Sequence, residues 1–105
     1  MSQWIRVAQA SEVPPGGSCE VVAGERVVAL FHTAEGWYAL DGICPHQGGP
    51  LGKGRLTDCL VTCPWHGWQF DVRSGQSQLS SGLRQPTLAV KIEGDGVYVD
   101  LGAAG

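Results

Sequence analysis

Two short loops that each carry one cysteine and one histidine constrain this chain more than any other feature. The first reads Cys44-Pro45-His46 and the second reads Cys63-Pro64-Trp65-His66, with sixteen residues between His46 and Cys63. In an extended segment, residues i and i+2 point to the same side, so Cys44 and His46 can reach toward one centre. Cys63 and His66 lie within one turn and can reach the same centre. The sequence therefore predicts a metal site held by these four side chains.

Two kinds of centre use two cysteines and two histidines. Structural zinc sites usually bring their ligands in like pairs, Cys with Cys and His with His. Here each loop is mixed, which suits a two-iron cluster in which one iron takes both cysteines and the other takes both histidines. The ligand count alone leaves zinc open. Glycines follow each histidine, at 48, 49 and 67, and they allow the backbone to approach a bound group closely.

The remaining sequence predicts an all-β fold. Sixteen glycines and six prolines in 105 residues indicate many turns within one domain. Short β-rich runs recur between the turns, and they predict strands at residues 4–8, 19–23, 26–32, 37–40, 55–57, 60–62, 68–72, 88–93 and 97–101. One helical turn is expected at Ser11 and a turn at 52–54, and residues 76–86 are expected to form a covering loop. Strands at this spacing are typical of a sandwich or barrel.

The segment CPHQGGPLGKGRLTDCLVTCPWHGWQF, residues 44–70, resembles the cluster-binding region of Rieske [2Fe–2S] proteins. The flanking runs FDVRSGQ and LAVKIEGDGVYVDL resemble the small Rieske ferredoxins that serve bacterial ring-hydroxylating oxygenases. They also resemble the small subunit of assimilatory nitrite reductase. The resemblance implies a Rieske fold over residues 1–105, an antiparallel β-sandwich or barrel base with a cluster-binding subdomain inserted at about residues 43–68.

The resemblance also implies a cofactor and a role. One [2Fe–2S] cluster is expected, with Cys44 and Cys63 on the inner iron and His46 and His66 on the outer iron. The chain is then expected to carry single electrons from a reductase to a terminal oxygenase. It is not expected to be an enzyme by itself, because His32 alone cannot build a two-His, one-carboxylate iron site. The alternatives are a Rieske subunit of a nitrite reductase-type complex and, more remotely, a structural zinc module.

Four positions depart from the respiratory branch of the family that the motif resembles. That branch has an additional cysteine in each loop, joined as a disulfide, where this chain has Gly49 and Trp65. It also has a serine and a tyrosine whose hydroxyls donate to sulfur, where this chain has Trp68 and Phe70. Fewer donors leave the reduced state less stabilised. We therefore expect a reduction potential near the low end of the Rieske range, which runs from about −150 to about +300 mV.

Charge and hydropathy limit the partners and the location. The formal net charge is −3 and no block of Lys or Arg occurs, so no nucleic-acid footprint is present. The N-terminal residues lack a basic region followed by an apolar run, and the longest apolar stretch, Val27–Phe31, is too short to span a membrane. We expect a soluble, cytoplasmic chain with no membrane partner.

The other cysteines and aromatic residues are expected to be structural. Cys19 and Cys59 lie among apolar residues and are expected to be reduced, buried thiols within strands. Trp4 and Trp37 are expected in the core. His32 is expected at a strand end without a functional role.

Two tryptophans flank the second predicted loop and have two interpretations each. In the functional interpretation, Trp65 forms with Gln47 and Pro50 an apolar patch that docks a redox partner. In the structural interpretation, both indoles shield the cluster from water and pack the two loops together. Packing is the favoured interpretation for both, more strongly so for Trp68. Asp71 and Gly75 are expected to shape the turn that follows. Lys53, Arg55, Arg73 and Arg84 are interpreted as solvated surface rather than a docking site.

Overall fold

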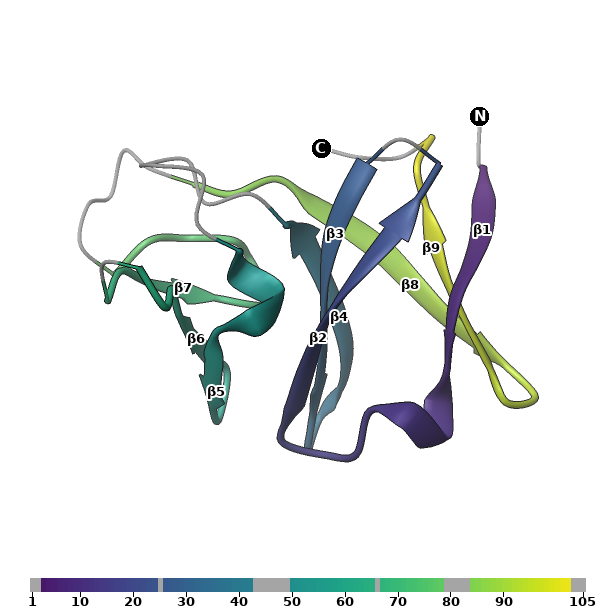
Figure 1. Cartoon of the computed structure of the whole chain (residues 1–105), viewed down its shortest axis with the longest axis horizontal. Helices are drawn as coiled ribbons and strands as arrows, with labels where there is room; N and C mark the ends of the chain where they lie inside the picture. Colours follow the sequence, from purple (N-terminus) through teal and green to yellow (C-terminus); the bar gives the residue numbers. More distant parts are fainter. Residues whose placement is uncertain (1–2, 25, 43–49, 66, 79–83, 103–105) are drawn as a thin grey trace.

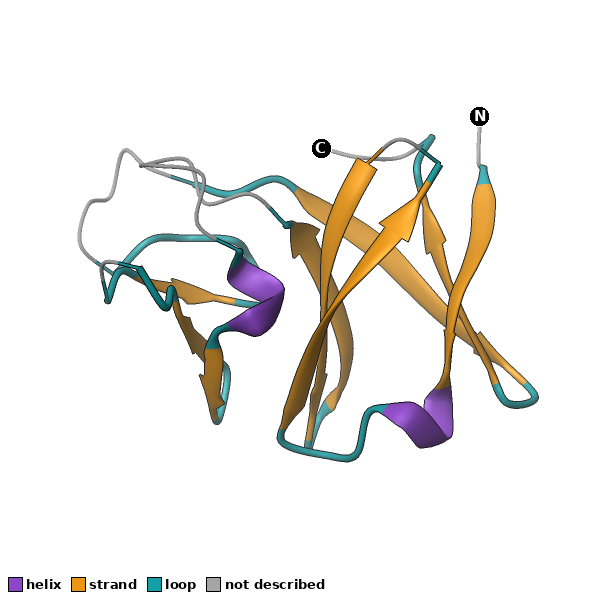
Figure 2. Ribbon diagram, viewed as in Figure 1, coloured by secondary structure: helices purple, strands orange, loops and turns teal. Residues whose placement is uncertain are grey.

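The computed structural model describes residues 3–24, 26–42, 50–65, 67–78 and 84–102, and this part of the chain is built almost entirely of strands (Figure 2). The strands are β1 (Trp4–Gln9), β2 (Gly17–Ala23), β3 (Arg26–Thr33), β4 (Gly36–Asp41), β5 (Arg55–Thr57), β6 (Leu60–Thr62), β7 (Gln69–Asp71), β8 (Thr87–Glu93) and β9 (Gly96–Asp100). Two 3-10 helices, η1 (Ala10–Glu12) and η2 (Leu51–Lys53), complete these elements. None of the described residues belongs to a helix that is long and apolar enough to cross a membrane.

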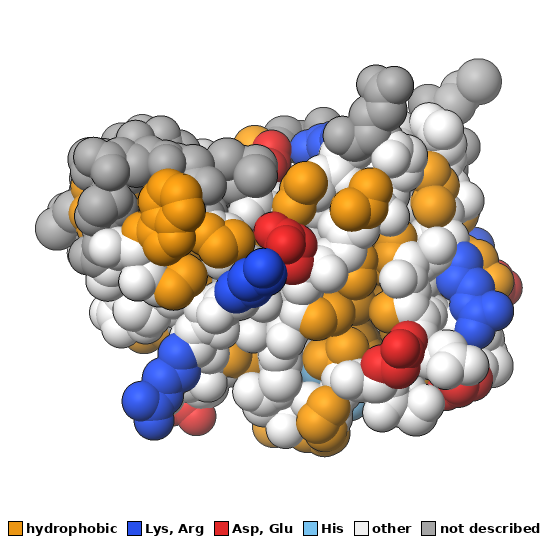
Figure 3. All heavy atoms as spheres, viewed as in Figure 1, with side chains coloured by type: hydrophobic (Ala, Val, Ile, Leu, Met, Phe, Trp, Pro, Cys, Tyr) orange, Lys and Arg blue, Asp and Glu red, His pale blue; other side chains and the backbone are white. Residues whose placement is uncertain are grey.

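Six strands form one large antiparallel sheet in the order β1-β9-β8-β4-β3-β2. The sheet curves until its two edge strands, β1 and β2, face each other (Figure 1). Apolar side chains are visible between these edges on the face shown in Figure 3. The large sheet is therefore a nearly closed barrel, and this base is the architecture that the sequence predicts.

The other three strands form a small antiparallel sheet in the order β5-β6-β7. In the sequence it lies between β4 and β8, and in space it lies to one side of the large sheet (Figure 1). The turn between β5 and β6 contains Asp58, whose φ of 55° is in the left-handed region that Asp tolerates better than most residues. The small sheet ends at Asp71, three residues beyond the expected end of the inserted subdomain.

Strand β3 separates two hydrophobic cores. Its alternate residues Val28 and Leu30 join the inner core, which fills the barrel, with Val97 and Val99. The other side of β3 belongs to the outer core, which joins the large sheet to the small one. The buried members of the outer core are Ala29, Phe31, Leu40, Leu51, Val61, Cys63, Phe70 and Val72. The unbroken apolar run Val27–Phe31 is thus explained, because a strand buried on both faces needs apolar residues at every position.

The predicted strands and the helical turn at Ser11 are confirmed, with small shifts at the ends. Trp68 is an exception, since β7 begins at the next residue. The chain does turn at residues 52–54, as expected: η2 ends at Lys53, Gly54 follows it, and η2 packs on β2. A Cβ at Gly52 would lie 2.7 Å from the carbonyl oxygen of Cys19, so only glycine permits this approach.

The prediction that Trp4 belongs to the core is wrong. Its side chain is on the outer face of β1 with 36% of its surface exposed, and the Lys91 ammonium lies 4.5 Å from the ring centre. Trp37 does pack against the inner core, where it stacks on His32 with 4.0 Å between ring centres. His32 also forms a 2.7 Å hydrogen bond from Nδ1 to the carbonyl oxygen of Val13. Its role is structural, because this bond ties the chain after η1 to β3.

Candidate metal centre

The second predicted ligand loop is a narrow connection between β6 and β7. The Cys63 backbone N–H donates to the Trp68 carbonyl oxygen at 2.7 Å, and the Gly67 N–H donates to the Cys63 carbonyl oxygen at 3.0 Å. Gly67 has a φ of 72°, a conformation that favours glycine. These bonds close the loop at its base and fix where the Cys63 side chain begins.

Cys63 is the one predicted ligand among the described residues, and its environment fits a metal-bound thiolate. It is 1% exposed and belongs to the outer core together with Val61 and Phe70. Its thiol is free rather than in a disulfide. A sulfur donor enclosed by apolar side chains keeps water away from a bound iron, and such shielding is one of the factors that set the potential of an iron–sulfur site.

The other three predicted ligands, Cys44, His46 and His66, lie outside the described residues. Hydrogen bonds hold the described residues at both ends of the first loop. The Leu51 N–H donates to the Gly42 carbonyl oxygen at 3.0 Å, and the Gly42 N–H donates to the Val27 carbonyl oxygen at 2.9 Å. The large sheet therefore holds both ends of the first loop together.

The two ligand-bearing loops are thus attached to different sheets. The first leaves β4 of the large sheet and returns at η2, which packs on β2. The second connects two strands of the small sheet. Any group bound by residues of both loops depends on how the two sheets are positioned relative to each other.

The two tryptophans of the second loop differ in exposure. Trp65 is 58% exposed, although it is among the largest apolar side chains of the molecule. Trp68 is half-buried and packs against the outer core, as its structural interpretation predicts. The exposure of Trp65 favours the docking interpretation over the shielding one, because an indole in water is available to another protein.

The expectation for the two remaining cysteines is only partly met. Cys19 does lie in a strand, but it is half-buried; burial, followed by the charge of Glu12, raises its pKa. Cys59 lies in the β5–β6 turn rather than in a strand. Its thiol donates to Glu35 Oε1 at 3.2 Å, and this hydrogen bond is the main reason why the pKa of Cys59 is raised. No local sequence pattern predicts this contact, because the partners are 24 residues apart.

The turn after β7 is shaped by Asp71 and Gly75, as predicted. The Gly75 N–H donates to the Asp71 carbonyl oxygen at 2.7 Å, and the φ of Gly75 is 79°. The Asp71 carboxylate binds Arg73 through two side-chain hydrogen bonds, of 2.8 and 3.1 Å. The hydrogen bonds from Arg73 hold the pKa of Asp71 below its usual value.

Comparison with protein families gives a direct match. The Rieske [2Fe-2S] domain matches residues 3–91. Cholesterol 7-desaturase nvd 1 of Ciona intestinalis is 39% identical over 65% of this chain, and human apoptosis-inducing factor 3 is 37% identical over 89% of it. The chain spans only 15% and 16% of the length of these two relatives.

Other relatives are matched along nearly their whole length. The ferredoxin component of the naphthalene 1,2-dioxygenase system of Pseudomonas aeruginosa is 31% identical, with 94% of this chain and 96% of that protein covered. The ferredoxin of carbazole 1,9a-dioxygenase from Nocardioides aromaticivorans IC177 superposes with a TM-score of 0.84 at 25% identity, covering 92% of this chain and 96% of the other. A putative nitrite reductase small subunit from Mycobacterium tuberculosis shares the fold, with a TM-score of 0.87 at 20% identity and 98% of each chain covered.

Proposed function

The chain belongs to the Rieske [2Fe-2S] domain family, and on that premise we propose that it is a one-electron carrier between a reductase and a terminal oxygenase. The observation that carries the proposal is the match to a dioxygenase ferredoxin component along 96% of that protein's length. Such a match relates this chain to a carrier component rather than to a catalytic chain.

One [2Fe–2S] cluster would be held by Cys44, His46, Cys63 and His66. The cysteines would take one iron and the histidines the other, as the mixed loops predict. When bound, the cluster supplies reversible one-electron chemistry. The protein contributes a buried position for the Cys63 sulfur and the apolar shield of Trp68 and the outer core. The subdomain that would hold this cluster spans about residues 43–68 and consists of the two ligand loops with β5 and β6 between them.

Trp65 would provide the contact with redox partners. It is directly before the proposed ligand His66 in sequence, and it is exposed. A large aromatic side chain that loses its exposed surface on binding is typical of the few residues that dominate interface energies. A partner bound at Trp65 would therefore be close to the histidine side of the proposed site.

The redox partners that we propose are inferred from what the relatives are named. Several of them are named as ferredoxin components of oxygenase systems, and a solved structure pairs a ferredoxin with the oxygenase of carbazole 1,9a-dioxygenase. We infer that this chain receives electrons from a reductase and delivers them to an oxygenase, in the cytoplasm, while catalysis belongs to the partner.

The alternative is a Rieske subunit of a nitrite reductase-type complex, and the remote alternative is a structural zinc module. The likeness to nitrite reductase small subunits is one of fold. The difference between carrier and subunit is biochemical: a carrier purifies alone and binds its partners transiently, whereas a subunit purifies with a large catalytic chain.

Two measurements test the proposal. Metal analysis with absorption and electron paramagnetic resonance spectra of the dithionite-reduced protein should show two irons per chain and a Rieske-type signal. A colourless protein with one zinc ion would refute the cluster. Affinity purification of the full chain from its native host should give the chain alone at high salt, and stable recovery with a sirohaem protein would instead establish the nitrite reductase-type subunit.

A further inference from the structure

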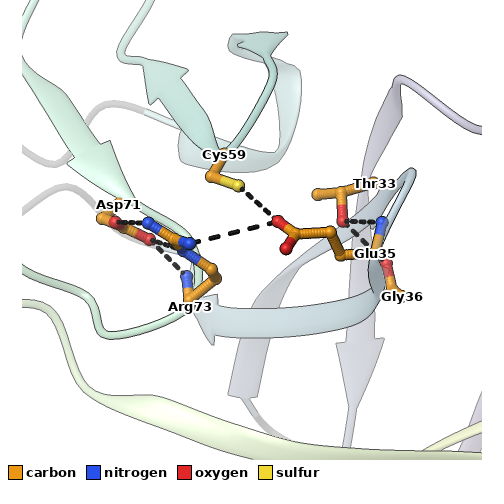
Figure 4. Close-up of polar contacts among 6 residues, drawn as sticks. All are labelled: Thr33, Glu35, Gly36, Cys59, Asp71 and Arg73. Carbon is orange, nitrogen blue, oxygen red and sulfur yellow. Dashed lines mark hydrogen bonds and ion pairs between the residues drawn. The ribbon is translucent and has the colours of Figure 1, made fainter.

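A polar junction joins the large sheet to the small sheet at the β3–β4 turn. Glu35, in this turn, extends toward two residues of the small-sheet side (Figure 4). Its Oε1 atom accepts a hydrogen bond from the Cys59 thiol at 3.2 Å and lies 4.0 Å from Arg73 Nη1. One carboxylate therefore contacts both the β5–β6 turn and the chain that follows β7.

The partners on both sides are already oriented. Thr33 is 4% exposed, and its hydroxyl accepts the Glu35 N–H at 3.1 Å while donating to the Gly36 carbonyl oxygen at 3.2 Å. On the other side, Asp71 holds the Arg73 guanidinium through its two side-chain hydrogen bonds. The Glu35 backbone and the Arg73 guanidinium are thus held independently of the junction, whereas the Glu35 side chain is 61% exposed.

The backbone connects this junction to the proposed ligand Cys63. The Val72 N–H donates to the Cys59 carbonyl oxygen at 2.8 Å, so Cys59 and the end of β7 are tied to each other. From Cys59 the chain continues through the three residues of β6 directly into Cys63. A displacement of the Cys59 turn is therefore transmitted along a short strand to the second loop.

We propose that Glu35 is a positioning residue that fixes the small sheet against the large one and thereby sets the second ligand loop relative to the first. This inference rests on the proposed function, because it assumes that both loops bind the same cluster. The first loop is held by the large sheet and the second by the small sheet, so cluster geometry requires the two sheets to be fixed. The outer core joins them by apolar contact, which is not directional, and the Glu35 junction adds directional contacts at the β5–β6 turn.

The test uses hydrogen–deuterium exchange on the protein as purified. In Glu35→Ala, exchange of the Cys63 and Val72 amides should accelerate by about two- to fivefold, the size expected for loss of exposed charged contacts. The Leu101 amide, which donates to the Gln3 carbonyl oxygen at 3.0 Å, should be unchanged, because it exchanges by local fraying near the chain ends and this fraying leaves the Glu35 contacts intact. Glu35→Gln keeps an acceptor for Cys59 but loses the charge facing Arg73, and it should give an intermediate effect.

Glu93→Ala is the matched control. Glu93 is also an exposed carboxylate in an ion pair, with Lys91 at 3.6 Å, but it lies on β8 away from the small sheet. It should leave all three amides unchanged. In a double-mutant cycle, Cys59→Ala should accelerate exchange less in the Glu35→Ala background than in the wild type, because the hydrogen bond between these two side chains is already lost there.

A second measurement is the rate at which the protein loses its iron. Release of iron to a chelator should accelerate by about the same factor in Glu35→Ala and not in Glu93→Ala. The inference is overturned if the Cys63 amide is unaffected, if the Leu101 amide accelerates equally, or if Glu93→Ala behaves as Glu35→Ala does. If the purified protein carries zinc, the proposed function fails while the exchange results still decide whether Glu35 positions the loop.

Discussion

The backbone N–H of Cys63 and the carbonyl oxygen of Trp68 are joined by a 2.7 Å hydrogen bond across the base of the second ligand loop. The bond closes the loop at its base, and Cys63 at this closure is buried in the outer core. A proposed ligand is thus fixed by backbone geometry while its neighbour Trp65 remains exposed.

Replacing Cys63 by serine should remove the cluster, because a hydroxyl does not supply the thiolate that iron takes. Iron per chain should fall by more than about tenfold. Substitution of residues that are not ligands should cause a smaller loss. Cys19→Ser is the control, since Cys19 lies in the inner core and should leave iron content unchanged. Full iron content in Cys63→Ser would contradict the ligand assignment.

The reduction potential of the wild-type protein should lie near the low end of the Rieske range, close to about −150 mV. Phe70 is fully buried and Trp68 half-buried, and neither brings a hydroxyl to the second loop. The extra negative charge of the reduced state is then less stabilised. A redox titration followed by electron paramagnetic resonance measures the midpoint, and a value above about 100 mV would show that other donors compensate.

Trp65→Ala should weaken partner binding without changing the potential. Loss of an exposed aromatic contact at an interface costs more than about 1 kcal/mol, so the Kd for the reductase or oxygenase should rise at least about fivefold. The midpoint potential and the unfolding free energy should remain as in wild type. Trp4→Ala serves as the control, because Trp4 is exposed on β1 instead. Equal effects of the two substitutions would argue against docking at Trp65.

Leu51→Ala should destabilise the protein by about 2–5 kcal/mol, the usual cost of truncating a fully buried leucine. Leu51 is 0% exposed and begins η2, between the two sheets. Val22→Ala is the comparison, since Val22 is 65% exposed and its truncation should change stability by less than about 0.5 kcal/mol. Urea unfolding of both variants measures the difference, and similar midpoints would place Leu51 outside the core.

Alkylation of Cys59 should require a higher pH in wild type than in Glu35→Gln. The hydrogen bond to Glu35 raises the pKa of this thiol, so the reactive thiolate forms only at higher pH. Weakening the acceptor lowers the pKa, and the rate–pH profile should move toward lower pH. Mass spectrometry of iodoacetamide-treated protein follows the reaction at Cys59, and superimposable profiles would show that Glu35 has no influence on the thiol.

Much of this fold follows from local sequence. The hairpins at Gly24 and Gly94 were predictable because glycine adopts the positive φ values of 62° and 60° that these turns need. The double burial of β3 follows from its unbroken apolar run. The ligand set was equally visible, since the paired spacing of cysteine and histidine is unusual, and it stays a prediction for Cys44, His46, Cys63 and His66.

Long-range contacts were not predictable. Trp4 looked like a core residue because aromatic residues in strands usually are, but β1 is an edge strand and Lys91 covers its outer face. Glu35 looked like an ordinary turn residue. Its contacts with Cys59 and Arg73 arise only once two sheets that are distant in sequence come together, and no local pattern encodes them.

Strand β3 borders both hydrophobic cores. The small sheet therefore supplies only one side of the outer core that buries Cys63. A fragment cut out at residues 50–78 would leave Phe70 and Val61 facing water, with Phe31 and Leu40 left behind on the barrel. Metal retention should consequently depend on the β3 wall of the barrel staying in place. Loosening β3 should discharge the cofactor before the rest of the chain has come apart.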